Sequence, residues 1–179
     1  IPTKKHTDSD TIRLGFHGSH THLSKFQPNL KVALEELDNV LNLELLIISS
    51  DPNFNWKVGK PNIKNIKHIK WNMDTIKEDL LSIDIGIVPN VTSYKIDDSD
   101  NSIDLGLYNT DYLLRMKNKS NAGRSFVFHQ LGIPVVADLT PSNFHIMGNQ
   151  NNGFLVSSKN GWKRSILKLT NYGNRNKIS

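Results

Sequence analysis

The sequence predicts an α/β domain with a doubly wound parallel sheet of about six strands and helices on both faces. Two observations indicate this fold. Short apolar segments alternate along the chain with segments whose apolar residues recur every three or four positions, as in alternating strands and helices. Residues 43–49 are apolar at nearly every position, as expected for a strand covered on both faces. A length of 179 residues fits one such domain.

The expected strands carry different local signals. Residues 12–16 and 66–71 alternate apolar and polar side chains. Pro89 ends the fourth strand, whereas Pro134 lies near the start of the fifth, where a proline is tolerated. The six expected strands are 12–16, 43–49, 66–71, 84–89, 133–137 and 153–156.

Helices are expected between these strands. The first has Pro28 in its first turn and an apolar face that includes Leu30, Leu34 and Leu37, and the third ends at Gly132. The residues expected to begin or cap a helix are Ser24, Asp74, Asn121 and Pro141, and the last helix is expected over residues 162–169.

The first eleven residues are polar and charged, without an apolar period. We expect residues 1–11 to be a linker that leads into a domain over residues 12–179. Because the chain begins with Ile1 rather than Met, it looks like a piece of a longer protein.

Charge and composition narrow the function classes. Lys and Arg total 22 against 17 Asp and Glu, a net charge of +5 that favours an anionic ligand. These charges are scattered along the chain, so nucleic-acid binding is not indicated. The absence of cysteine excludes disulfides, thiolate metal sites and cysteine nucleophiles. No apolar run has the length of a membrane span or a signal peptide, and a cytoplasmic location is expected.

The expected fold also predicts where a ligand binds. In an open parallel sheet, ligands bind at the carboxyl ends of the strands, where the strand order reverses. The long polar segment from Asn90 to Ser120 follows one of these ends and is expected to be functional, and poorly ordered without a ligand or partner domain. The segments expected to form the site begin at His17, Trp71, Pro89 and Asp138, together with the helix start at Asn121.

One part of the chain resembles a known family. Residues 119–137 run from a basic and polar turn into a helix that ends in Gly132-Ile-Pro-Val-Val-Ala. This stretch resembles the signature of GT-B glycosyltransferases, especially family 4. Shorter resemblances occur in the family's order along the chain, at residues 16–19, 84–89, 140–142 and 152–156.

The resemblance implies a Rossmann-like domain that forms the C-terminal, nucleotide-sugar-binding half of a two-domain enzyme. It implies hexosyltransferase activity with a nucleotide-diphosphate sugar as donor, no cofactor or metal, and an N-terminal acceptor domain that is absent from this chain. Peripheral membrane association of the full-length protein fits this view, and the chain alone is expected to be inactive. Two alternatives stay open: a non-catalytic glycosyltransferase-like module that binds a nucleotide or a partner, and one half of a nucleotide-sugar epimerase.

The helix that begins near Asn121 is the expected phosphate site. A diphosphate needs positive charge and backbone N–H donors, which a helix start supplies. This helix offers the N–H groups of Ala122 and Gly123, with Lys119 and Arg124 beside them, and Gly123 leaves room for a phosphate. We expect Arg124 and Lys119 to contact the diphosphate and, as exposed cations, to contribute little to stability. The alternative is an ordinary helix capped by Asn121 with two solvated cations.

Two residues depart from the family's pattern. The family carries two glutamates separated by seven residues, the second of which contacts the donor ribose, and these positions correspond to Lys119 and Val127. Both carboxylates are missing. Either other groups hold the ribose, or donor recognition has diverged, or the domain no longer catalyses. No catalytic residue is assigned.

Other candidate ligand contacts lie in the first and third expected loops. Gly18 is followed by Ser19, and Lys25 is the nearest lysine, which either reaches the donor phosphates or is solvated. Trp71 either stacks against the nucleotide base or is a core residue at a strand end.

Three histidines in the first loop have spacing that could supply imidazoles to a metal ion. They are His17, His20 and His22, and no carboxylate accompanies them, so we expect no metal site there. A position near the sugar phosphates or on the exposed loop is expected instead. The acidic residues within 97–104 lack regular ligand spacing and are expected to be solvated.

Overall fold

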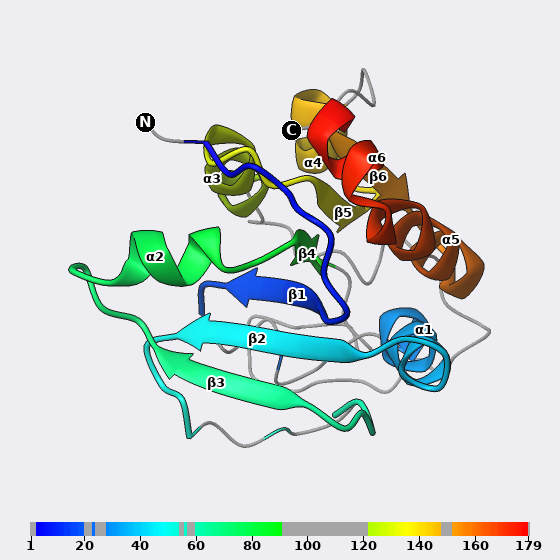
Figure 1. Cartoon of the computed structure of the whole chain (residues 1–179), viewed down its shortest axis with the longest axis horizontal. Helices are drawn as coiled ribbons and strands as arrows, with labels where there is room; N and C mark the ends of the chain where they lie inside the picture. Colours follow the sequence, from blue (N-terminus) through cyan, green and yellow to red (C-terminus); the bar gives the residue numbers. More distant parts are fainter. Residues whose placement is uncertain are drawn as a thin grey trace, which may run out of the picture.

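Six parallel strands form one sheet within the residues that the computed structural model describes, which are 3–19, 23, 28–53, 56, 60–90, 122–147 and 152–178. The strand order is β3-β2-β1-β4-β5-β6, and each neighbouring pair is parallel (Figure 1). The strands are β1 (Ile12–His17), β2 (Leu43–Ser49), β3 (Ile66–Lys70), β4 (Ile85–Val88), β5 (Val135–Asp138) and β6 (Gly153–Val156). The expected sheet is therefore confirmed.

Helices cover both faces of the sheet, as expected for a doubly wound fold. Successive residues of β2 alternate between two cores. On one face α1 and α5 contribute Leu34 and Trp162, and on the other α2, α3 and α4 contribute Leu80, Phe128 and Met147. The helices are α1 (Pro28–Asp38), α2 (Ile76–Leu81), α3 (Gly123–Gln130), α4 (Pro141–Met147), α5 (Lys159–Thr170) and α6 (Tyr172–Ile178).

The strand order reverses between β1 and β4. The chain moves outward from β1 through β2 to β3, and then returns through α2 to the other side of β1 (Figure 1). Gly15 and Gly86 are paired at this point. A β-carbon on Gly86 would come within 2.5 Å of the Phe128 ring, so the glycine allows α3 to pack directly against β4. The carboxyl ends of β1 and β4 therefore lie beside α3.

The segment expected to be a linker is packed against the domain. Figure 1 shows it passing α3 and α6 before it enters β1. The Lys4 N–H donates to the Leu131 carbonyl at 2.8 Å, and His6 is 3% exposed. Residues 3–11 lack regular secondary structure, yet they bind the other end of the chain, since the His6 N–H donates to the Asn176 side-chain oxygen at 3.0 Å.

Two expected helix starts differ in the structure. Helix α2 begins at Ile76, and its N-cap residue is Thr75 rather than Asp74, without a capping hydrogen bond from the side chain. In the turn before the helix, the Asn72 side-chain oxygen accepts from the Asp74 N–H at 2.9 Å. Helix α3 begins at Gly123 with Ala122 as the N-cap residue, one position after the expected Asn121. The prediction of these two caps was therefore wrong.

The end of the chain is more helical than expected. Ser158 caps α5, with its hydroxyl accepting from the Gly161 N–H at 3.1 Å, and α5 runs over Lys159–Thr170 rather than only 162–169. Helix α6 follows and was not predicted. Ser24 lies outside the described residues, as do residues 91–120 of the long segment, whereas its first residue, Asn90, is buried.

Candidate functional site

The carboxyl ends of β1, β4 and β5 meet the first turn of α3. β1 ends at His17, and Gly18 follows it with a φ of +126°, a backbone conformation that favours glycine. β4 is followed by Asn90, and β5 ends at Asp138. Residues from four separate parts of the sequence thus come together at the point where the strand order reverses, as the sheet topology predicted.

Arg124 lies at the centre of this group. Its Nη2 donates to the Asn90 side-chain oxygen at 3.1 Å, and its guanidinium carbon is 5.3 Å from the centroid of the Phe16 ring. A β-carbon on Gly18 would be 3.5 Å from Arg124 Cδ, so the side chain runs alongside the turn after β1. Burial lowers the Arg124 pKa to about 10, against the opposing attraction of Asp138. The guanidinium is therefore a largely buried cation at neutral pH.

A polar network supports the residues around Arg124. The Asn90 N–H donates to Asp138 Oδ2 at 2.8 Å, and the Asn143 side-chain amide donates to the Asp138 carbonyl at 2.9 Å. Ser125 donates to the Asn143 side-chain oxygen at 3.1 Å, which links α3 to α4. Asn90, Asp138, Ser125 and Asn143 are all buried. Buried polar groups satisfied in this way hold the site in one arrangement.

His17 lines the same site as a neutral imidazole. Its Nε2 lies 3.4 Å from the Arg124 carbonyl, and since a carbonyl only accepts, Nε2 carries the proton. The ring packs edge-on against Phe128, with the centroids 4.8 Å apart. Burial lowers the His17 pKa to about 4. His17 therefore orients the first turn of α3 and adds no charge at neutral pH.

The structure brings some of the expected site residues together. Gly18, Ala122, Gly123 and Arg124 gather at the strand-order reversal, and Ser19 is exposed beside them. Lys25, Lys119 and Asn121 lie outside the described residues, as do His20, His22 and the acidic residues within 97–104. Their roles stay predictions.

Trp71 and Val127 lie elsewhere. Trp71 follows β3 at the edge of the sheet, with β2 between it and β1, and its side chain is 45% exposed, so it is not a core residue. Val127 packs, partly buried, against the core on the α3 face. Neither contacts Arg124 in the interactions described above.

Sequence analysis did not single out three of the residues that shape this site. Asn90, Asn143 and Phe16 contact Arg124 or its supporting network. Asp138 was named only as the start of a loop. The signal that could have found Asp138 is an acidic residue directly after the apolar run 133–137, a position at the carboxyl edge of a buried strand.

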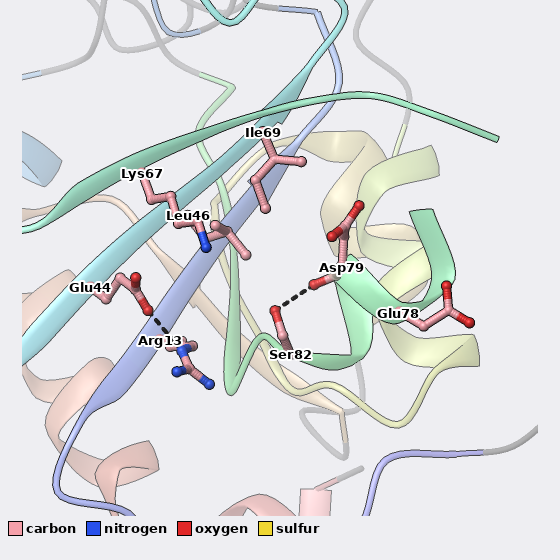
Figure 2. A pocket seen from close by; sticks show the side chains of 8 residues that line it. All are labelled: Arg13, Glu44, Leu46, Lys67, Ile69, Glu78, Asp79 and Ser82. Atoms are coloured by element: carbon pink, nitrogen blue, oxygen red, sulfur yellow. Dashed lines mark hydrogen bonds and ion pairs between the residues drawn. The ribbon is translucent and has the colours of Figure 1, made fainter. Parts of the chain in front are cut away.

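A groove of about 290 Å³ lies at a different place, between α2 and the sheet (Figure 2). Figure 2 shows the Arg13 and Glu44 side chains joined across β1 and β2, with Nε and Oε2 2.7 Å apart. Its walls carry both signs of charge, with Lys67 facing the sheet side and Asp79 the helix side. The groove is therefore separate from the Arg124 site, with which it shares none of its lining residues.

The described residues contain no group of three or more histidine, aspartate or glutamate side chains placed to hold a metal ion. Among the described helices, none is long and apolar enough to cross a lipid bilayer. The described part of the site offers a largely buried cation beside a helix start, and the buried carboxylate of Asp138 is linked to that cation through Asn90. The cation and the helix N–H groups are suited to an anion.

Comparison with known proteins shows the fold. WaaG, a glycosyltransferase involved in lipopolysaccharide biosynthesis, matches with a TM-score of 0.59 and 16% identity. The fold of this chain is similar to that of one part of this glycosyltransferase. The glycotransferase of kitacinnamycin gives a TM-score of 0.52 at 10% identity, and TarM gives 0.51 at 12%. No family model and no curated protein matches the sequence.

The match covers nearly all of this chain and less than half of each of the others. It includes 96% of this chain and 41% of WaaG, 99% and 39% for the kitacinnamycin glycotransferase, and 99% and 32% for TarM. This chain thus corresponds in length to one part of each of those proteins.

Proposed function

We propose that this chain is the donor-binding domain of a glycosyltransferase that moves a sugar from a nucleotide-diphosphate sugar to an acceptor. The observation that carries the proposal is Arg124. It lies at the start of α3, where the strand order reverses, and it keeps its charge although it is largely buried. A buried cation next to helix N–H groups binds a diphosphate more strongly than a solvated one does.

In this proposal the chain binds the donor and stabilises the leaving group. Arg124 and the N–H groups of Ala122 and Gly123 contact the diphosphate, and the turn at Gly18 and Ser19 lines the same space. As the sugar bond breaks, negative charge accumulates on the departing diphosphate, where fixed donors and cations stabilise it most. Lys25 and Lys119 are proposed as further phosphate contacts. Trp71 is proposed to face the nucleotide base, and Val127 takes the position near the ribose.

The proposal extends to the whole protein. The donor domain would work together with an N-terminal acceptor domain. The full-length protein would be cytoplasmic and would associate peripherally with a membrane. No cofactor is required. Because the reaction needs both halves of such a site, the isolated chain is expected to bind a nucleoside diphosphate without transferring sugar.

One observation favours a second candidate, a non-catalytic nucleotide-binding module. Val127, which corresponds to the family glutamate that contacts the ribose, packs against the core and offers no polar atom. A domain that has lost this contact could keep the diphosphate site and lose catalysis.

Thermal unfolding in the presence of UDP, GDP or ADP tests the shared claim of both candidates. A ligand that binds only the folded state raises Tm, and the rise grows with the logarithm of the ratio of ligand concentration to Kd. We expect at least one nucleoside diphosphate to raise Tm at millimolar concentration, and the matching nucleoside without phosphates to leave it unchanged. A Tm that no diphosphate shifts would overturn both. An assay of sugar transfer in the presence of an acceptor domain then distinguishes the two candidates. Transfer would indicate the glycosyltransferase, and binding without transfer would indicate the non-catalytic module.

A further inference from the structure

Asp138 is the residue behind the proposed phosphate site. It is 1% exposed at the end of β5, and its Oδ2 accepts from the Asn90 N–H at 2.8 Å. The side-chain oxygen of the same Asn90 accepts from Arg124 Nη2 at 3.1 Å. Asp138 and Arg124 therefore contact opposite ends of one residue, and Asn90 fixes the position of the cation relative to the carboxylate.

The two charges also act on each other directly. Burial disfavours the charged form of Arg124, and the negative charge of Asp138 favours it. His17, which packs against the same turn, is neutral and does not compete. In the unliganded protein, Asp138 thus supplies negative charge that an anionic ligand would supply when bound.

We infer that Asp138 is the internal counter-ion of Arg124 and limits how tightly the site holds a nucleoside diphosphate. The inference rests on the proposed function. A diphosphate is attracted by Arg124 and repelled by the fixed carboxylate behind it. The nucleoside diphosphate released as product has one more ionisable phosphate oxygen than the nucleotide sugar, so the repulsion acts more strongly on the product. Compared with a site that lacks this carboxylate, Asp138 therefore weakens the binding of the product more than the binding of the donor.

Asp138→Asn tests this directly, because the amide keeps an oxygen that can accept from the Asn90 N–H while the charge is lost. We expect calorimetry to show about tenfold tighter binding of the nucleoside diphosphate, together with a lower Tm of the unliganded protein. The matched control is Asp38→Asn, which removes the same charge from a carboxylate that is 6% exposed at the end of α1 and accepts from the Lys64 N–H. The control should bind the nucleotide as the unmodified chain does.

Asn90→Asp tests the same idea with the opposite sign. It places a second carboxylate against Arg124 in a side chain of the same shape, and we expect roughly tenfold weaker binding of the nucleoside diphosphate. If Asp138→Asn does not fold, this variant alone tests whether negative charge beside Arg124 limits the affinity for the nucleoside diphosphate, and unchanged binding would overturn the inference. Adding Arg124→Ala to Asp138→Asn should abolish the gain in affinity, because the effect passes through Arg124.

The outcomes separate the inference from the proposed function. If the unmodified chain binds no nucleoside diphosphate, both fail. If it binds, and Arg124→Ala weakens binding, but Asp138→Asn binds equally or more weakly, only the counter-ion role is overturned. A purely structural role for Asp138 predicts this last result, because a disturbed Asn90 would misplace Arg124. An equal gain in Asp38→Asn would also overturn the inference, since it would show a general effect of net charge.

Discussion

The guanidinium of Arg124 lies over the ring of Phe16, with its central carbon 5.3 Å from the ring centroid. This contact links the start of α3 to β1, and we expect it to give Arg124 a role in the stability of the fold. From the sequence, Arg124 was expected to be an exposed cation of little consequence for stability. In the structure its side chain is largely buried, so the expectation of an exposed cation is wrong, whereas its effect on stability stays a prediction.

Arg124→Ala should therefore lower the free energy of unfolding by about 1–3 kcal/mol, from the lost hydrogen bond to Asn90 and the lost contact with Phe16. Urea unfolding measures this. Arg124→Lys should retain part of the stability, because the lysine stem still packs along Gly18. An unchanged unfolding midpoint for Arg124→Ala would show that the buried contacts contribute nothing.

Gly86→Ala should destabilise the fold by about 1–3 kcal/mol, because the added methyl group would overlap the Phe128 ring. Chemical unfolding of the variant gives the value. Combining it with Phe128→Leu should cost less than the sum of the two single changes, because the smaller side chain frees the space. Simple additivity would mean that the clash is relieved elsewhere.

Arg175→Met should lower the free energy of unfolding by about 2–4 kcal/mol. The guanidinium is fully buried and donates to the Thr170 carbonyl at 2.7 Å, the Leu169 carbonyl at 2.8 Å and the Thr7 carbonyl at 2.9 Å. Methionine would leave these buried acceptors without that donor. Arg164→Met, at an exposed position on α5, is the control and should have little effect. Equal stability of the two variants would show that the hydrogen bonds of Arg175 contribute nothing to the stability of the fold.

Stability should fall as the pH drops from about 6.5 towards 4. Burial lowers the pKa of His17 and of His129 to about 4, and also lowers that of His6. In the unfolded chain these groups have pKa values near 6.5, so in this range the unfolded state binds more protons and is favoured. Their contribution is complete above pH 6.5 and is lost as the pH approaches the folded-state values.

His129→Gln checks this pH dependence. Its unfolding free energy should fall less steeply between about pH 7 and pH 5 than that of the unmodified chain, because one buried histidine no longer takes up a proton. Parallel curves for the two proteins would show that His129 titrates normally in the folded state.

The sheet could be predicted because its signals are local. An apolar run such as 43–49 identifies a buried strand wherever it lies in the chain, and the alternation of strands and helices dictates parallel pairing. The rule that ligands bind where the strand order reverses predicts Gly18 and Arg124 at one edge of the sheet, where the structure has them.

The polar contacts could not be predicted in this way. His6, Arg175 and Asn176 come from the two ends of the sequence, and they meet only because the sheet brings α6 beside the first segment. Polar residues paired across such distances leave no period in the sequence. The same holds for Asn90 and Asp138, whose contact depends on β4 and β5 being neighbours.

The central claim is that Arg124 binds the diphosphate of a nucleotide, and calorimetric titration of Arg124→Ala with the nucleoside diphosphate that raises Tm tests it most directly. We predict about tenfold or greater loss of affinity, with Arg124→Lys recovering only part because its single ammonium cannot make a two-pronged contact. Lys168→Ala, on α5 with its ammonium over the Phe154 ring, is the control and should bind as the unmodified chain does. If Arg124→Ala binds with the same affinity as the unmodified chain and the control, the account is contradicted, and the phosphate site has to be sought at Gly18, Ser19 and Lys25.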